Sequence, residues 1–74
     1  MLKVIYNICY ETGNSYEPID YYTEVTYVPW ETTTTQIFTM LQEEIDSLNK
    51  HCNNRVWLGE VDFEEANEDE YNEH

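Results

Sequence analysis

The stretch TTTQIFTMLQEEIDSLNKHC, residues Thr33–Cys52, decides the fold because it is the longest segment with helical periodicity. Its apolar side chains recur at spacings of three and four and form one stripe: Ile37, Phe38, Leu41, Ile45, Leu48 and Cys52. Thr33 and Gln36 fit a capping box at the helix start, with Thr32 as the alternative cap. The stretch therefore predicts an amphipathic helix that buries one side and exposes acidic residues on the other.

Two segments before this helix alternate in the period-two manner of β-strands. Residues 2–10 carry apolar side chains at both parities, which favours a central strand over an edge strand. Residues 11–18 contain a cluster of turn formers, and residues 19–28 then form the return strand of a hairpin.

Residues 55–63 are the third strand candidate. The favoured register turns Trp57, Val61 and Phe63 toward the helix, although a bulge at Gly59 would switch it. The expected fold class is α+β: a three-stranded antiparallel β-sheet with the first strand central, one amphipathic helix packed on one face, and an acidic C-terminal tail.

Acidic residues crowd the end of the chain. Eight of the sixteen acids lie among the last fifteen residues, with no Lys or Arg between them. Such a block cannot bury enough apolar surface to offset the entropy lost on ordering it. We therefore expect one compact ββαβ domain over residues 1–63 and a mobile acidic tail over residues 64–74.

The net charge of −13 on 74 residues restricts the partners. So much negative charge repels nucleic acids and anionic membranes, and it favours a basic protein; the alternative is acidity for solubility alone. The start of the chain has no secretory signal pattern, and no run is long and apolar enough to cross a bilayer. Cys9 and Cys52 allow one disulfide, but free thiols in the cytosol are the default. A small core also allows a homodimer.

Catalytic patterns are not found in the sequence. Paired carboxylates occur without an apolar pocket that would separate their pKa values. Cys9, His51 and Cys52 lack the spacing of a zinc site, and the acids near Asp62 lack the glycine-centred calcium loop. We therefore expect no enzymatic activity, no metal and no cofactor.

The acidic side chains are the candidate binding residues. Asp20 and Glu24 are expected on the open face of the sheet, and they would join the helix exterior and the tail in one continuous acidic surface. Carboxylates at alternate positions of a strand lie about 6.6 Å apart, and a duplex strand carries one phosphate per roughly 3.4 Å, so such a ladder can occupy phosphate-binding Lys and Arg. Tyr22 and Tyr71 can occupy base-stacking platforms. The candidate acids are Asp20, Glu24, Glu43, Glu44, Asp46, Glu60, Asp62, Glu64, Glu65, Glu68, Asp69 and Glu70.

In its short length, heavy acidity, mixed αβ body and acidic end (residues 64–70), the chain resembles the small phage proteins that mimic nucleic acids. This type includes anti-CRISPR and anti-restriction proteins and inhibitors of DNA-repair enzymes. The resemblance implies a host-defence inhibitor that acts in the bacterial cytosol and occupies the basic groove of a CRISPR effector such as Cas9, or of a restriction or repair nuclease. The alternative function is a non-inhibitory acidic adaptor that binds a basic partner protein.

Overall fold

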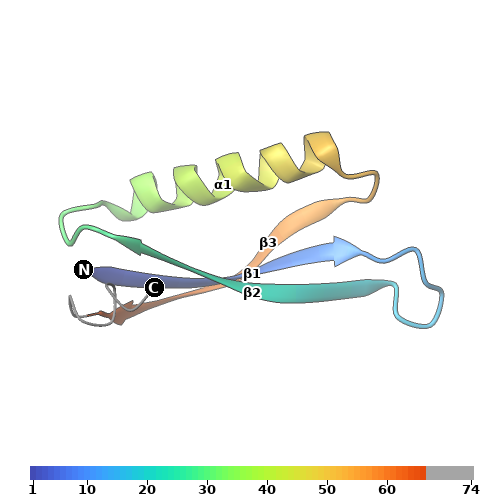
Figure 1. The fold of residues 1–74 in the computed structure, drawn as a ribbon, viewed down its shortest axis with the longest axis horizontal. Coiled ribbons are helices and arrows are strands. Elements are labelled where there is room, and N and C mark those ends of the chain that lie inside the picture. The colour runs from blue at the N-terminus through green and yellow to red at the C-terminus, as the bar shows by residue number, and fades with distance from the viewer. Residues whose placement is uncertain (67–74) are drawn as a thin grey trace.

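The computed structural model describes residues 1–66, and residues 67–74 lie outside the described part. The elements follow the order β1 (Leu2–Glu11), β2 (Ile19–Val28), α1 (Thr34–His51) and β3 (Val56–Glu65) (Figure 1). The three strands form one antiparallel sheet in the order β2-β1-β3, and α1 crosses one face of it. The α+β prediction with a central first strand is therefore confirmed. The face under α1 is called the helix-bearing face below, and the opposite one the open face.

Helix α1 begins and ends where the sequence predicts. The Thr33 side chain accepts a hydrogen bond from the Gln36 backbone N–H at 3.1 Å, and the Gln36 side chain accepts one from the Thr33 N–H at 2.9 Å. At the other end Cys52 has an extended backbone, and its N–H donates to the Leu48 carbonyl at 2.9 Å. The reciprocal hydrogen bonds between Thr33 and Gln36 satisfy N–H donors that the first turn of the helix leaves unpaired.

The core lies between α1 and the helix-bearing face. Ile37, Leu41 and Ile45 of the helix are buried, and they pack in one cluster with Val4, Tyr6, Ile8, Val28 and Val56 of the sheet. Two members of the predicted apolar stripe lie outside this core. Phe38 lies at its margin, where its ring meets that of Phe63 edge-on at 6.5 Å, and Cys52 is exposed. The buried stripe is therefore narrower than the sequence pattern suggests.

Strand β3 contains a bulge halfway along, and beyond it the alternate residues that point to each face of the sheet are exchanged. Ile8 pairs with Leu58, but Tyr6 pairs with Val61, so two residues of β3 stand opposite Asn7. The extra residue lets both halves of β3 contribute apolar side chains to the same face. Val61 and Phe63 face the helix, as the favoured register predicts. Trp57 faces away from the helix, because the bulge at Gly59 changes which alternate residues of β3 point to each face, as the alternative register predicts.

Gly59 gives a direct test of the bulge. A Cβ atom at this position would lie 2.9 Å from the Cys9 Sγ atom and 3.2 Å from the Asn7 Cβ atom. We expect Gly59→Ala to lower the free energy of unfolding by about 1–2 kcal/mol in urea denaturation, because overpacking forces neighbours to shift. Adding Cys9→Ala should recover part of the loss, since it removes the nearest clashing atom. A Gly59→Ala variant as stable as the wild type would contradict the tight approach.

The sheet continues past the expected domain boundary after Phe63. Strand β3 ends at Glu65, and the next residue, Ala66, is buried. The Ala66 N–H donates to the Met1 carbonyl at 3.0 Å, and the Met1 amino group donates to the Ala66 carbonyl at 3.1 Å. The folded body therefore includes residues 64–66, because they pair with the start of β1. The mobility expected for the remaining tail falls on residues outside the described part.

Candidate acidic interface

The acidic residues of β2 lie on the helix-bearing face, not on the open face as expected. Tyr6, Ile8 and Tyr10 face the core, and they pair with Glu24, Tyr22 and Asp20 of β2, respectively. Residues directly opposite each other on neighbouring strands share a face. The prediction was wrong because the loop between Glu11 and Ile19 determines which residues of β1 and β2 stand opposite each other. In the observed register, the alternate residues of β2 that include the acids stand opposite the buried residues of β1.

Glu24 and Glu44 gather around the hydroxyl of Tyr6. The Tyr6 hydroxyl donates a hydrogen bond to Glu44 Oε2 at 2.5 Å, and this bond joins the middle of α1 to the central strand. Burial raises the pKa of Tyr6 above its usual range, and the Glu44 hydrogen bond and the charges of Glu44 and Glu24 add to the rise. Glu44 is therefore half-buried and held by the sheet, whereas the sequence had placed it on the helix exterior.

Tyr22 extends this group along β2. Its ring lies 6.1 Å from that of Tyr10, tilted by 50°. Burial raises the pKa of Tyr22, with further contributions led by the charges of Glu24 and Glu44. Tyr6, Tyr22, Glu24 and Glu44 are called the tyrosine–glutamate cluster below. It places two carboxylates and an exposed aromatic ring within one small area.

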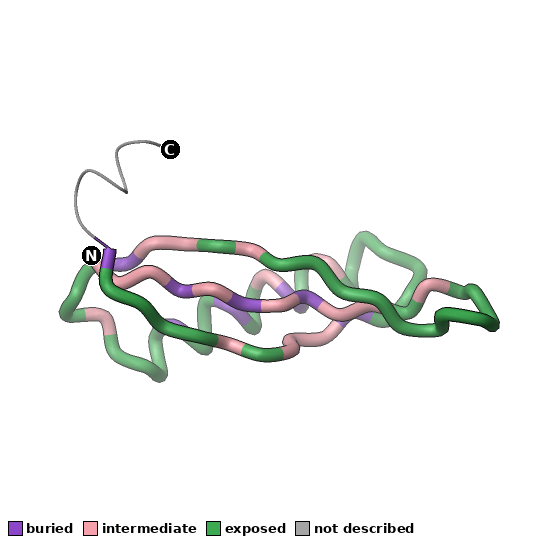
Figure 2. The backbone as a smooth tube through the Cα atoms, turned by 90° about the horizontal axis from the view of Figure 1, so that it is seen from below, coloured by how far each residue is buried: buried purple, intermediate pink, exposed green. Residues whose placement is uncertain are grey.

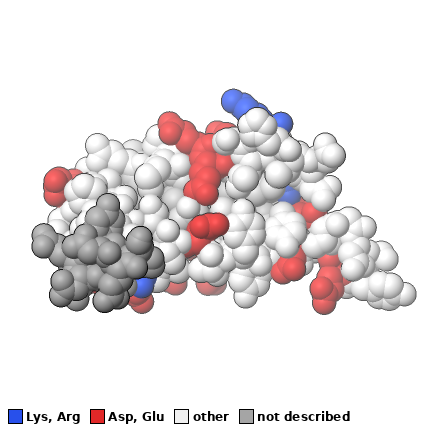
Figure 3. Space-filling model, in the orientation of Figure 1, with Lys and Arg blue, Asp and Glu red and all other residues white. Residues whose placement is uncertain are grey.

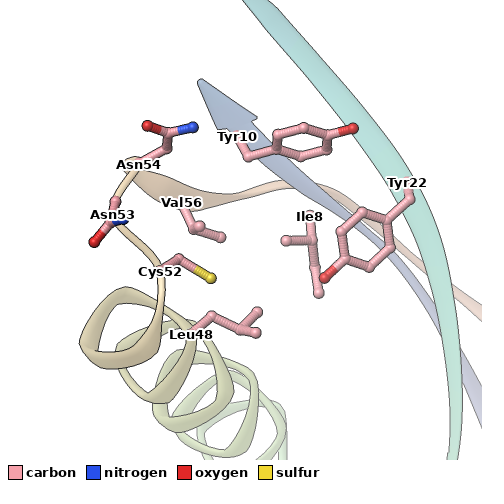
Figure 4. Close-up of a pocket in the computed structure, with 8 residues that line it drawn as sticks. All are labelled: Ile8, Tyr10, Tyr22, Leu48, Cys52, Asn53, Asn54 and Val56. Carbon is pink, nitrogen blue, oxygen red and sulfur yellow. The ribbon is translucent and has the colours of Figure 1, made fainter. Parts of the chain in front are cut away.

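A groove lies beside the cluster, between the end of α1 and the sheet (Figure 4). It has a volume of about 490 Å³ and is mostly apolar, with Ile8, Leu48 and Val56 at its base. Figure 4 shows the Tyr10 and Tyr22 rings along one side and Cys52, Asn53 and Asn54 along the other. The groove can therefore admit a flat or apolar group next to the acidic area.

Glu43 and Asp46 complete the acidic area on the outer side of α1. Both are exposed, and Asp46 accepts a hydrogen bond from the Gln42 side chain at 3.0 Å. In Figure 3 acidic side chains gather over the middle of the helix and continue onto the sheet beneath it. The structure therefore brings together Glu24 and Glu44, which come from two elements twenty residues apart in the chain, and Glu43 precedes Glu44 on the exposed side of α1.

The β3 acids form a second, separate group. Glu64 pairs with Lys3 and Asp62 with Ile5 in the sheet register, so both lie on the open face, and Glu60 lies in the bulge at the same edge. The Lys3 ammonium is 4.0 Å from Glu64. The expected continuous surface is thus divided into two groups on opposite faces, with Glu65 exposed at the end of β3. Glu68, Asp69, Glu70 and Tyr71 lie outside the described residues.

The chain's three basic residues also have definite positions. Lys3 lies on the open face, and the Arg55 guanidinium lies 5.5 Å from the Trp57 ring centre on that face. Lys50 is in the last turn of α1, where a positive charge favours the helix dipole. No basic side chain therefore comes from β2 or from the middle of α1, where the tyrosine–glutamate cluster lies.

Sequence reasoning missed Tyr6 and Tyr10 as members of the site. Both belong to the alternating apolar pattern of β1, which indicates strand packing and no binding role. Their pairing with Glu24, Tyr22 and Asp20 depends on the hairpin register, which a turn of this length leaves undetermined. The alternation of Asp20, Tyr22 and Glu24 along β2 is the one sequence signal that could have indicated polar residues at the edge of the core.

The described residues contain neither a metal-binding cluster nor a membrane-spanning helix. Over residues 1–66 the side chains of His, Cys, Asp and Glu form no group of three that could hold a metal ion. Helix α1, the helix of this region, is too polar to span a bilayer. Comparison with protein-family models, curated proteins and solved structures finds no match to this chain.

Proposed function

We propose that this protein inhibits a nucleic-acid-binding enzyme by occupying its basic DNA- or RNA-binding groove as a nucleic-acid mimic. The observation that supports this most is that Glu24 of β2 and Glu44 of α1 meet beside the Tyr6 hydroxyl, in a part of β2 and α1 that has no basic residue. Lys and Arg side chains that hold phosphates can pair equally well with carboxylates at such a surface.

The Tyr6 hydrogen bond gives this surface a fixed shape. It holds the Glu44 carboxylate over the central strand, beside the partner strand that carries Glu24. A carboxylate that is already positioned loses less conformational freedom on binding than one on a free side chain. The exposed ring of Tyr22 lies next to these charges and can contact an aromatic or guanidinium group that normally stacks on a base.

The target class is the one that the resemblance to phage nucleic-acid mimics implies: a CRISPR effector such as Cas9, or a restriction or repair nuclease, in the cytosol of a bacterial host. The protein would act by stoichiometric binding and without a reaction of its own. The rival function, a non-inhibitory acidic adaptor, would use the same carboxylates without blocking the groove. Competition between this protein and DNA or guide RNA for the target therefore distinguishes the two functions.

A matched pair of variants tests whether the position of the charges matters. Glu24→Gln/Glu43→Gln removes two charges from the acidic area, and Glu17→Gln/Glu31→Gln removes two exposed charges elsewhere, so each changes the net charge from −13 to −11. We expect the first pair to weaken binding to the target nuclease about tenfold or more, and the control pair much less. Binding is measured by titration at several salt concentrations, and the wild-type affinity should fall steeply with salt.

Two results would count against the proposal. Equal losses in the two variants would show that only the net charge matters. A nuclease that binds this protein yet loads its DNA or guide RNA normally would support the adaptor function instead.

A further inference from the structure

The open face of the sheet is unusually apolar for a face that no described element covers. Figure 2 views the sheet from the side away from α1, and no described element crosses it. Antiparallel sheets normally place polar side chains on a free face, and contiguous apolar surface marks an interaction site. Ile19 and Tyr21 expose 58% and 60% of their surface there. The apolar residues of this face are Ile5, Ile19, Tyr21, Val25, Tyr27 and Trp57.

Charged residues lie at the two ends of this face in opposite orders. On β1, Lys3 lies at one end and Glu11 at the other. On the β3 side the order is reversed, because Glu64 pairs with Lys3 while the Arg55 carbonyl accepts a hydrogen bond from the Glu11 N–H. The outermost row at each end therefore carries one base and one acid, and these two rows are complementary to each other. Asp62 is a further acid on this face, one row in from Glu64 and opposite Ile5.

We propose that a second copy of this chain docks on the open face, with the two sheets face to face. The two-fold axis lies between the sheets and runs across the strands near Asn7. This rotation exchanges the ends of the strands and keeps β1 over β1 and β3 over β3. It places Lys3 opposite the partner's Glu11, and Glu64 opposite the partner's Arg55.

The shape of the face fits the same arrangement. Beside Glu11, Ile19 and Arg55 the face is hollowed, with a volume of about 400 Å³. The rotation brings Tyr27 of the second copy over Ile19, because these residues lie at opposite ends of β2. Sheets that pack about 10 Å apart interlock their side chains, so the tyrosine can enter this hollow.

The charge pattern favours a second copy over other occupants. A two-fold axis along the strands would place Lys3 against Lys3, whereas the axis across them pairs unlike charges. A chain of net charge −13 is repelled by anionic lipid and by its own acidic helix-bearing face. On the open face, unlike charges of two copies can oppose each other at both ends, and its burial gives a small domain a second core layer.

Reciprocal charge reversal tests the arrangement in the full-length chain. Sedimentation equilibrium from micromolar to millimolar concentration at physiological ionic strength should show a reversible dimer. Arg55→Glu and Glu64→Arg should each raise the dissociation constant about tenfold, and the double variant should restore it, because both contacts are then reversed together. Glu43→Arg changes the charge as Glu64→Arg does, but on the helix-bearing side, and should not weaken the dimer.

A further variant tests the position of the axis. Glu60 lies at the bulge, opposite Asn7. Because the proposed two-fold axis passes near Asn7, Glu60 of one copy approaches Glu60 of the other. Glu60→Gln should therefore tighten the dimer. Circular dichroism confirms that each variant is folded. A chain that stays monomeric at all concentrations overturns the proposal, and so does a dimer that the double variant fails to restore, since it would use another surface.

Discussion

Replacing Leu41 with alanine is expected to lower the free energy of unfolding by about 3 kcal/mol, because the substitution leaves a cavity in the centre of the core. Leu41 is 1% exposed, and it lies between Ile37 and Ile45 on the buried side of α1. A domain of this size has a total stability of roughly 4–10 kcal/mol, so this single change removes a large part of it. The loss is measured by urea denaturation followed by circular dichroism.

Met40→Ala is the matched control for Leu41→Ala. Met40 is the preceding residue of the same helix and is 38% exposed, and alanine favours the helix at both positions. We expect its free energy of unfolding to change by less than about 1 kcal/mol. Similar losses at the two positions would show that α1 does not pack on the sheet through the face described above.

Tyr6→Phe is expected to have the second large effect, in two parts. At neutral pH it removes the hydrogen bond to the Glu44 carboxylate, which should lower the free energy of unfolding by about 2 kcal/mol. The second part is a change in pH dependence, because burial, the first cause, and the Glu44 and Glu24 carboxylates raise the pKa of Tyr6 above its ordinary 10.0.

The direction of the pH effect follows from the raised pKa. Below pH 10 Tyr6 is neutral in both the folded and the unfolded chain, so its stabilising contribution is complete. Above pH 10 the unfolded chain loses the proton first, and the contribution falls by about 1.4 kcal/mol per pH unit until the folded pKa is reached. The wild type should therefore lose more stability than Tyr6→Phe between neutral pH and pH values above 10.

Urea denaturation across this alkaline range measures the difference between the two proteins. Tyr16→Phe is the control, because Tyr16 is 94% exposed and its hydroxyl is already in water. Its stability at neutral pH should match that of the wild type. Parallel loss of stability in wild type and Tyr6→Phe above pH 10 would show that the folded structure does not protect the Tyr6 proton.

The helix and the order of the strands could be predicted because local signals specify them. Thr33 and Gln36 form the cap that the sequence indicates, and the apolar spacing of Ile37, Leu41 and Ile45 fixes the buried side of α1. Apolar residues at both parities of β1 correctly indicated the central strand. These features depend on residues close together in the sequence.

The composition of the candidate site could not be predicted because it depends on pairing across the sheet. A period-two pattern shows which residues of β2 share a face but not which face meets the helix. Apolar Ile19, Tyr21 and Val25 were the natural choice for the core, yet the hairpin register turns them to the open face. Long-range register therefore decided both the acidic area and the apolar face opposite to it.

The two proposed surfaces are compatible, since they lie on opposite sides of one sheet. Pairing through the open faces would leave both helix-bearing faces on the outside, each with its tyrosine–glutamate cluster. One assembly would then present two acidic areas and could hold two target molecules. The charge-reversal variants at Arg55 and Glu64 leave this area unchanged, so the failure of one proposal can be told apart from the failure of the other.

The central position of β1 also has a consequence for synthesis on the ribosome. Strand β1 leaves the exit tunnel before β3, with which it pairs along one edge, and Leu2 lies opposite Glu65. The hairpin of β1 and β2 can form early, but the second edge of β1 has no strand to pair with until residues 56–65 have been translated and released. Completion of the sheet must therefore wait for β3, and until then the nascent protein exposes an apolar strand edge that chaperones can bind.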